Sequence, residues 1–407
     1  MFENLVHQEA GKGISAEIRK HSLPGSILFA GPESSGKLTA ALESARILSC
    51  YNHQQPGKWT CECPSCLKHK ALTCTNLMLM GPRDCTLEIS AAKDSFIEAT
   101  RNNASYLTAS RYLLVRSSRK LTLRFNGILW RGESNLSKVG TIIEEINDNL
   151  EKLDVSRKLP PQEEIEKLCE ELYKLSVKLE KDFLYDSIPV NQIRNMEEWA
   201  HIKSEEGKKT VIIENADRMA VSVRNALLKI LEEPPADCVF ILLTSKRNAI
   251  MQTILSRVRT YNFIERDSLA QKEVISRVFH DETFNGSIND FLMNYLPIKP
   301  EEIKKQSEYF YTNISRRQIP DIKNIVKNCD DFNLKLELKI FLNHIAFQQR
   351  KLMYTQCGVE ASAKTMDLLR ACWDNITLYN QSPVSALDIL LRDISLINVS
   401  NDGVFSK

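Results

Sequence analysis

The chain has 407 residues, of which 43% are hydrophobic, and a formal net charge of only +2. This length predicts two or three domains, and the near-neutral charge excludes a simple polycation, so any nucleic-acid contact is local or shared with partners. No apolar stretch approaches the roughly 20 residues of a membrane span, and Met1-Phe2-Glu3-Asn4 lacks the layout of a signal peptide. We therefore expect a cytoplasmic protein with no membrane partner, whose eleven cysteines do not form disulfides.

A phosphate-binding loop is predicted at residues 31–37. The apolar run 26–30 indicates a buried strand, Gly-Pro-Glu-Ser-Ser-Gly-Lys follows it, and a helix begins at Lys37. Backbone N–H groups of such a loop, the helix dipole and the lysine can together hold a phosphate. The next position normally carries a hydroxyl that ligates Mg²⁺, but Leu38 stands there, and the hydroxyl of Thr39 comes one residue late. We expect a loop that binds a nucleotide and handles the metal poorly; a glycine turn that matches by coincidence is the alternative.

Four cysteines crowd into 17 residues, at Cys50, Cys61, Cys63 and Cys66. Four thiolates so close in sequence suit tetrahedral zinc. Two residues separate the last pair, as in a zinc knuckle, but only one separates the middle pair, so Cys74 or Cys85 could replace a ligand. No histidine is placed to leave an open coordination position. We predict structural zinc, with free buried or reactive cysteines as the alternative.

The block from about 86 to 186 has a different composition. Between Arg101 and Lys138 there are eight Lys or Arg and one acid, and between Val139 and Asp186 thirteen acids and seven bases. Helical spacing on both sides of Pro160-Pro161 predicts a helical hairpin in the acidic part. In the basic part, aromatic residues are interleaved with six cations: Arg111, Arg116, Arg119, Lys120, Arg124 and Arg131. Such a mixture could contact DNA or a partner subunit; the alternative is a basic surface balanced by the acidic hairpin.

Elsewhere, strands alternate with helices up to about residue 263. Besides the first strand, apolar runs predict strands at 77–80, 210–213 and 239–243 and a short one at 261–263, with helices at 192–202 and 222–231. Such alternation predicts a parallel sheet with a phosphate site at the strand ends. Beyond about 268 the strand signal fades, and the rest is predicted to be helical, including 334–347.

Two further positions bear on phosphate chemistry. Glu214-Asn215 follows the strand at 210–213. In phosphate-loop ATPases an aspartate there holds Mg²⁺ and a second polar residue positions water. Asn215 cannot accept a proton from water, so we expect no hydrolysis. Ser256-Arg257 lies near a sheet edge, where an arginine can complete a neighbour's nucleotide site; read alone, it is a surface arginine.

Together these features resemble the clamp-loader branch of the AAA+ ATPases. The stretch 225–235, Asn-Ala-Leu-Leu-Lys-Ile-Leu-Glu-Glu-Pro-Pro, is followed by an apolar strand, Thr244-Ser245 and Ser256-Arg257. That order is similar to the delta-prime and gamma/tau families of the bacterial DNA polymerase III clamp loader. The resemblance covers about 1–85 and 187–263 well, and the C-terminal helices by size and position only.

The resemblance implies an α/β fold with a particular division. A P-loop AAA+ parallel-sheet domain would occupy 1–263, with a zinc module inserted at about 50–74 and a second insert at about 86–186. A helical lid would follow at 264–300, and an all-α collar for oligomerisation at 301–407.

Carried over position by position, the resemblance also implies roles for single residues. The nucleotide would be bound by the loop and by two residues at strand ends: Gly31, Ser34, Ser35, Gly36, Lys37, Leu38, Thr39, Glu214 and Thr244. The four cysteines would bind zinc, and Arg257 would act in trans on a neighbouring subunit's ATP. Because Leu38 and Glu214-Asn215 depart from the hydrolysing pattern, a delta-prime-like stator is favoured over a gamma/tau-type motor.

The leading expectation is therefore a subunit without ATPase activity of its own, in a hetero-oligomeric ring that loads the sliding clamp on primed DNA. Its cofactors would be one structural Zn²⁺ and, if the loop is competent, ATP with Mg²⁺. Two alternatives stay open. One is an ATP-hydrolysing motor subunit, and the other is a zinc-dependent nucleic-acid-binding protein with a relic phosphate loop.

Overall fold

The computed structural model describes residues 1–52, 56–204, 207–400 and 405. The chain forms two compact units, Met1–Leu292 and Met293–Lys407, which are described separately. The predicted lid at 264–300 crosses this division, and the predicted domain boundaries stay predictions. Among the described residues, no helix has the length and apolar character needed to cross a bilayer.

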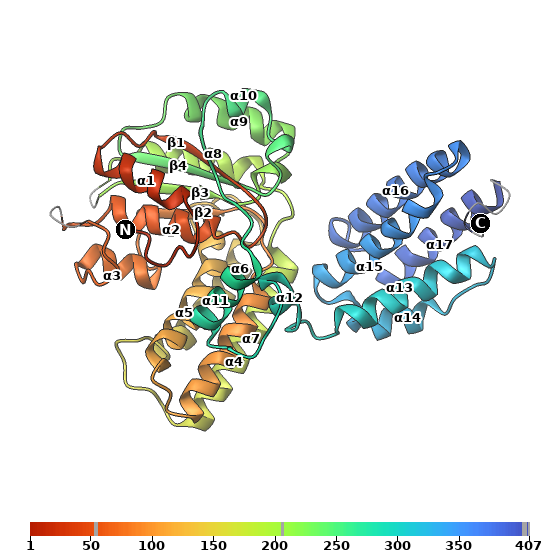
Figure 1. Ribbon diagram of the computed structural model, residues 1–407, viewed down its shortest axis with the longest axis horizontal. Coiled ribbons are helices and arrows are strands. Elements are labelled where there is room, and N and C mark those ends of the chain that lie inside the picture. Colours follow the sequence, from red (N-terminus) through yellow and green to blue (C-terminus); the bar gives the residue numbers. More distant parts are fainter. Residues whose placement is uncertain (53–55, 205–206, 401–404, 406–407) are drawn as a thin grey trace. The chain divides into compact units, whose positions relative to one another are not determined.

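One parallel sheet organises the first unit (Figure 1). Its order is β2-β3-β4-β1-β5. The strands are β1 Ser26–Ala30, β2 Leu77–Met80, β3 Lys209–Ile213, β4 Cys238–Thr244 and β5 Arg259–Asn262. Ala30 pairs with both Thr244 and Asn262, so the carboxyl ends of β1, β4 and β5 lie together at one edge. The predicted strands are confirmed, although the last begins two residues before its predicted start.

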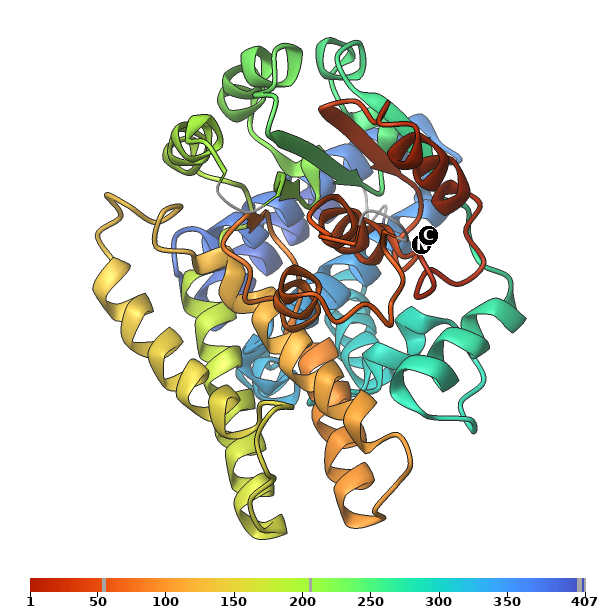
Figure 2. The ribbon, with the colours of Figure 1, turned by 90° about the vertical axis from the view of Figure 1, so that its left-hand side faces the viewer.

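Alternate strand residues face two separate hydrophobic clusters, as the two-residue period of a strand requires. Ile27 and Leu77 belong to the cluster that includes the first two helices, whereas Leu28 and Met78 belong to the cluster that includes the helices after β2. Figures 1 and 2 show helices on both sides of the strands. The helices of this unit are α1 Ala10–Arg19, α2 Lys37–Leu48, α3 Pro64–Ala71, α4 Thr86–Arg101, α5 Leu107–Thr122, α6 Leu136–Lys152, α7 Gln162–Phe183, α8 Val190–His201, α9 Val221–Glu232, α10 Gln252–Leu255, α11 Ser268–Phe279 and α12 Ile288–Met293.

The block at 86–186 is part of the core of the first unit. It supplies α4 to α7, and the predicted helical hairpin is the pair α6 and α7, which lie side by side with α4 and α5 (Figure 2). Trp130, Ile146 and Leu172 share one hydrophobic cluster with the sheet residues Val211 and Phe240. The block is therefore built onto one face of the sheet, because it buries that face.

The six cations of this block are bound by acceptors of the chain itself, which leaves the predicted contact with DNA or a partner without support; the alternative is met in part, because Arg119 lies 3.7 Å from Asp154 of the acidic part. Only one, Arg131, has a largely exposed side chain, and it pairs with Glu198. The others contact backbone carbonyls or buried carboxylates: Arg111 with Leu153, Asp154 and Arg157; Arg116 with His69 and Lys70; Arg119 with Ala71; Lys120 with Glu88; Arg124 with Glu214. These six cations therefore do not form an exposed strip for DNA. The sequence alone does not show that these side chains have buried hydrogen-bond acceptors within the chain.

The second unit is all-α, as predicted. Its helices are α13 Pro300–Ser315, α14 Ile322–Asn328, α15 Lys335–Gln348, α16 Gln356–Thr377 and α17 Pro383–Ser400. Phe310, Phe341 and Leu387 lie in its core. Two buried side chains also link helices to backbone carbonyls: Ser307 Oγ donates to Phe341 O at 3.0 Å, and Asn398 Nδ2 to Ile314 O at 3.0 Å.

Replacing Trp130 with Ala tests whether the block is part of the core. Trp130 is 1% exposed, stacks on Tyr185 with ring centroids 5.2 Å apart, and donates its indole N–H to Arg124 O. We expect a loss of about 3–5 kcal/mol in the free energy of unfolding, measured in urea. The control Ile128→Ala, at a 39% exposed position, should change it by roughly 0.5 kcal/mol at most. Equal losses in the two variants would contradict a core role.

Candidate functional site

The candidate nucleotide site lies at the carboxyl ends of β1 and β4, where residues 31–36 lead into α2. Gly31 N donates to Thr244 O at 3.2 Å, and a Cβ on Gly31 would fall 2.4 Å from Phe263 O. Gly36 has φ +92°, a conformation that suits glycine. Buried Ser35 donates its hydroxyl to Pro32 O at 2.8 Å. The loop is thus held in one shape against the neighbouring strands.

The side chain of Lys37 folds over this loop. Its Nζ donates to Gly31 O at 2.7 Å and to Pro32 O, and it lies 3.3 Å from Ser35 Oγ. Desolvation lowers the pKa of Lys37 to about 8, with Glu214 and Glu33 acting in the opposite direction. Phosphate bound in the loop would therefore meet a partly buried amine whose orientation is already fixed.

The predicted weakness at the metal position has a structural basis. Leu38 is buried and belongs to the hydrophobic cluster beneath α2, whereas Thr39 is exposed. Exposed Ser34 donates its hydroxyl to Asn289 Oδ1 at 2.5 Å. The side chain directly after Lys37 thus contributes to the core and offers no oxygen to a metal ion.

Glu214, at the position of a metal-binding carboxylate, is bound by two arginines. Arg83 Nη1 lies 2.8 Å from its Oε1, and Arg124 Nη2 contacts its Oε2. Arg83 Nη2 also pairs with Glu88 at 2.9 Å, and Lys120 contacts the same glutamate. Desolvation would raise the pKa of Glu214, but Arg83 and Arg124 outweigh it and lower that pKa. Both carboxylate oxygens are therefore engaged with cations of the chain.

The neighbouring polar residues are also engaged within the chain. Asn215 has φ +50° and donates its amide to Pro82 O at 2.6 Å. Thr244, which is buried, donates its hydroxyl to Asp217 Oδ1 at 2.6 Å and accepts from Lys246 N at 2.9 Å. The structure brings the loop, Glu214 and Thr244 to one edge of the sheet, as the sequence predicts.

Three arginines at this edge are missing from the sequence-based prediction: Arg83, Arg124 and Arg266. Arg266 Nη1 donates to Ser34 O at 2.5 Å. Arg83 and Arg266 are single arginines outside any recognisable motif, and Arg124 was assigned to the basic segment, so spacing linked none of them to this site.

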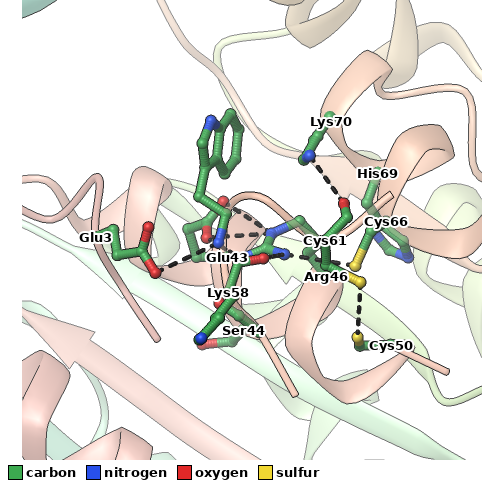
Figure 3. Close-up of polar contacts among 12 residues, drawn as sticks. Glu3, Glu43, Ser44, Arg46, Cys50, Lys58, Cys61, Cys66, His69 and Lys70 are labelled. Atoms are coloured by element: carbon green, nitrogen blue, oxygen red, sulfur yellow. Dashed lines mark hydrogen bonds and ion pairs between the residues drawn. The ribbon is translucent and has the colours of Figure 1, made fainter. Parts of the chain in front are cut away.

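The four predicted cysteines form a cluster that can hold a metal ion (Figure 3). Their Sγ atoms all lie within 4.8 Å of one another, and those of Cys50 and Cys61 are 3.8 Å apart. Zn–S bonds of about 2.3 Å in a tetrahedron imply S···S separations of roughly 3.8 Å. Cys74 lies beside His69 instead, with Sγ 3.4 Å from Nδ1, and Cys85 precedes α4, so neither belongs to the cluster.

The surroundings of the cluster act on its thiols in opposite directions: desolvation raises the pKa of Cys66 despite the nearby Arg46, whereas the pKa of Cys63 is lowered. Arg46, fully buried on α2, pairs with Glu43 at 2.8 Å and points Nη1 at Cys66 Sγ, 3.4 Å away (Figure 3). Desolvation would raise the pKa of Cys63, but the backbone N–H groups of Cys66 and Tyr51 more than offset it and lower that pKa to about 7. The lowered pKa of Cys63 suits a thiolate that binds a divalent ion.

Arg257 lies between α10 and β5. Its Nε and Nη2 contact Glu232 Oε2 at 2.8 and 2.7 Å, and its Nη1 donates to Thr253 O at 2.9 Å. The side chain is 29% exposed and that of Glu232 58% exposed. Arg257 is therefore accessible and held by one exposed ion pair.

Comparisons with known proteins give local matches. A family model described as DNA polymerase III, delta subunit, matches residues 141–267, from α6 to the residue before α11. The DNA polymerase III subunit delta' of Bacillus subtilis is 40% identical over 78 residues, which are 19% of this chain and 24% of that protein. Subunit delta' of Haemophilus influenzae is 36% identical over 76 residues, 18% of this chain and 23% of that protein.

Other matches are narrower or weaker. Subunit tau of Bacillus subtilis is 44% identical over 55 residues, 14% of this chain and 10% of that protein. The chain thus spans about a quarter or less of the length of these curated relatives. A solved gamma subunit-related protein of Thermotoga maritima is 16% identical, with a TM-score of 0.27, over 55% of this chain and 89% of that one. This TM-score is too low to show a shared fold.

We expect one zinc ion per chain purified without chelator, measured by metal analysis. Cys66→Ser should release the ion and lower the stability of the first unit, because structural zinc contributes folding energy. Cys74→Ser is the matched control, since Cys74 is buried nearby but lies outside the cluster. A chain without metal, or equal metal loss in both variants, would contradict the cluster as the zinc site.

Glu214→Gln should destabilise the chain, because it leaves Arg124, whose side chain is 1% exposed, without its counter-charge. Losing one partner of a buried ion pair costs about 3–5 kcal/mol. Glu33→Gln, on the exposed part of the loop, is the control.

The ion pairs of Glu214 also predict that the stability of the chain depends on pH. The folded-state pKa of Glu214 is lowered, so its stabilisation is present above the unfolded value of about 4.5 and is lost as the pH falls below it. Urea unfolding at pH 7 and pH 4 should show a smaller acid loss for Glu214→Gln than for the unaltered chain. Unchanged stability at pH 7 together with lost Mg²⁺ binding would instead identify Glu214 as a metal ligand.

Proposed function

We propose that this chain is a clamp-loader subunit of DNA polymerase III, as its local similarity to subunit delta' suggests, and acts there as a delta-prime-like stator. It would work within a hetero-oligomeric ring that loads the sliding clamp on primed DNA. The observation that carries the proposal is Glu214, whose two oxygens contact Arg83 and Arg124. A carboxylate bound in this way is a poor ligand for the metal that phosphoryl transfer needs.

Two other observations support a subunit that does not hydrolyse ATP. Leu38 packs into the core, so no hydroxyl follows Lys37 directly. Asn215 donates its amide to Pro82 O, which leaves no general base at the position that would orient water. The site therefore disfavours metal binding at Glu214, has no hydroxyl directly after Lys37 and has no general base at Asn215.

Arg257 supports the second half of the proposal, the lending of an arginine to a neighbour. Exposed ion pairs contribute only about 0–1 kcal/mol, so the pair with Glu232 can be exchanged for a phosphate at small cost. Arg257 could then stabilise the charge on a transferring phosphoryl group of the adjacent subunit. In this proposal the cysteine cluster holds Zn²⁺ in a structural role, next to α2 and α3.

A gamma/tau-type motor is the second candidate. The complete phosphate loop, with Lys37 in place, and the local similarity to subunit tau favour it. The zinc-dependent nucleic-acid binder is less favoured, because the cations of the basic segment contact acceptors inside the chain.

Arg257→Ala distinguishes the two candidates. In a complex reconstituted with the other clamp-loader subunits, it should reduce clamp-stimulated ATPase, since a missing arginine finger costs about 10³-fold or more at the site it serves. Total turnover should fall only in part, because other sites keep their own arginines. Lys37→Ala should have little effect on turnover, and the chain alone should hydrolyse ATP negligibly.

The control is Arg259→Ala, at an exposed arginine two residues along that pairs with Glu17. It should leave turnover unchanged. If Lys37→Ala abolishes turnover while Arg257→Ala is silent, the chain is a motor subunit and the stator assignment is wrong.

A further inference from the structure

Arg266 is a buried cation without a counter-charge in the part of the chain that the structure describes. It lies between β5 and α11 and is 8% exposed. Its Nε donates to Val6 O at 3.0 Å and its Nη1 to Ser34 O at 2.5 Å, and both acceptors are neutral carbonyls. Desolvation lowers the pKa of its guanidinium. Buried charges in proteins are normally paired, so a bound anion would stabilise Arg266 at this place.

The guanidinium of Arg266 is aimed at the phosphate loop. It contacts the loop through Ser34, and a Cβ built on Gly36 would fall 2.7 Å from its Nη2. That Nη2 has no acceptor among the residues described. An arginine donates in a fixed fork that matches phosphate oxygens. Arg266 therefore presents free donors beside the residue that precedes Lys37.

The loop itself offers further donors. The first N–H groups of a helix have no intrahelical acceptor, and the first such bond in α2 runs from Ala40 N to Gly36 O at 2.9 Å. The N–H groups of Lys37, Leu38 and Thr39 thus open a helix whose dipole favours an anion. Donors and positive charge converge on one loop from α2, from Lys37 and from Arg266.

The charges around the metal position of the same site disfavour a bound cation. The connected ion pairs around Glu214 comprise two carboxylates, Glu214 and Glu88, and three cations, Arg83, Arg124 and Lys120, so the group has a net charge of +1. A divalent ion placed there would be repelled, whereas phosphate oxygens would be attracted. The charge that Mg²⁺ provides in hydrolysing phosphate-loop enzymes is already supplied by side chains.

We propose that the phosphate loop is a metal-independent polyphosphate site in which Arg266, with Lys37, binds the phosphates of a nucleoside di- or triphosphate. Arg266 is a binding residue of this site and supplies the charge that the loop otherwise obtains from Mg²⁺. The nucleotide is held and not cleaved. This site goes beyond the stator role, which needs no bound nucleotide.

Titration calorimetry of ATP into the full-length, zinc-loaded chain tests the proposal. The buffers contain either Mg²⁺ or no divalent ion, and no chelator, so that the cysteine cluster keeps its metal. We expect dissociation constants within about threefold of each other, a difference below about 0.7 kcal/mol. Inorganic triphosphate should compete with ATP in the buffer without Mg²⁺, and inorganic phosphate should compete more weakly.

Arg266→Met should weaken ATP binding at least about tenfold in both buffers, as expected for lost charge-assisted hydrogen bonds. Arg259→Met, an exposed arginine of β5, is the matched control and should bind as the unaltered chain does. The midpoint of thermal unfolding without ligand reports whether each variant folds.

If Arg266→Met does not fold, ATP binding by Arg266→Lys tests the proposal instead. It keeps the charge, but its single nitrogen cannot reach the separate acceptors that Nε, Nη1 and Nη2 of an arginine reach, so it should bind ATP more weakly than the unaltered chain. The proposal is overturned by no ATP binding in either buffer, by binding only with Mg²⁺, by triphosphate that fails to compete, or by Arg266 variants that bind like the control. None of these results depends on the assembled complex, so the stator assignment is tested separately.

Discussion

The salt bridges of Glu214 are the constraint on which the first unit depends most. They join the end of β3 to Arg83, just before α4, and to Arg124, just after α5. A buried carboxylate between two arginines is stable only while all three remain in place. The same contacts fasten the 86–186 block to the sheet and occupy the oxygens that a metal would need. One set of ion pairs therefore determines both how the block is attached to the sheet and whether Glu214 can bind a metal ion.

Much of the fold could be predicted because it is encoded in local periodicity. Uninterrupted apolar runs such as 239–243 marked strands buried on both faces, and Gly31 and Gly36 marked a loop that side chains would distort. The cysteine cluster was predictable for a similar reason, since its four ligands lie within 17 residues and the short chain between them brings the thiols together.

The parts that could not be predicted depend on partners far apart in sequence. Arg124 and Glu214 are separated by 90 residues, and Arg266 and Ser34 by 232. An arginine looks the same in sequence whether it is solvated, donates to a carbonyl or neutralises a buried acid. The basic segment was misread for this reason, because its cations suggested an outside partner while their acceptors lay within the same unit.

Helix α5 and the turn after it connect two parts of the first unit. Arg116 and Arg119 donate to the last carbonyls of α3, the helix that carries Cys66, whereas Lys120 and Arg124 contact Glu88 and Glu214. Arg116 lies in α5 and Arg124 in the short 3-10 turn Leu123–Phe125 that directly follows it, so one continuous segment contacts both the helix that carries Cys66 and the end of β3. Partial metal loss during purification would therefore loosen one of the two contacts that hold this segment in place. Metal content thus becomes a measure of sample homogeneity for any ligand experiment on this chain.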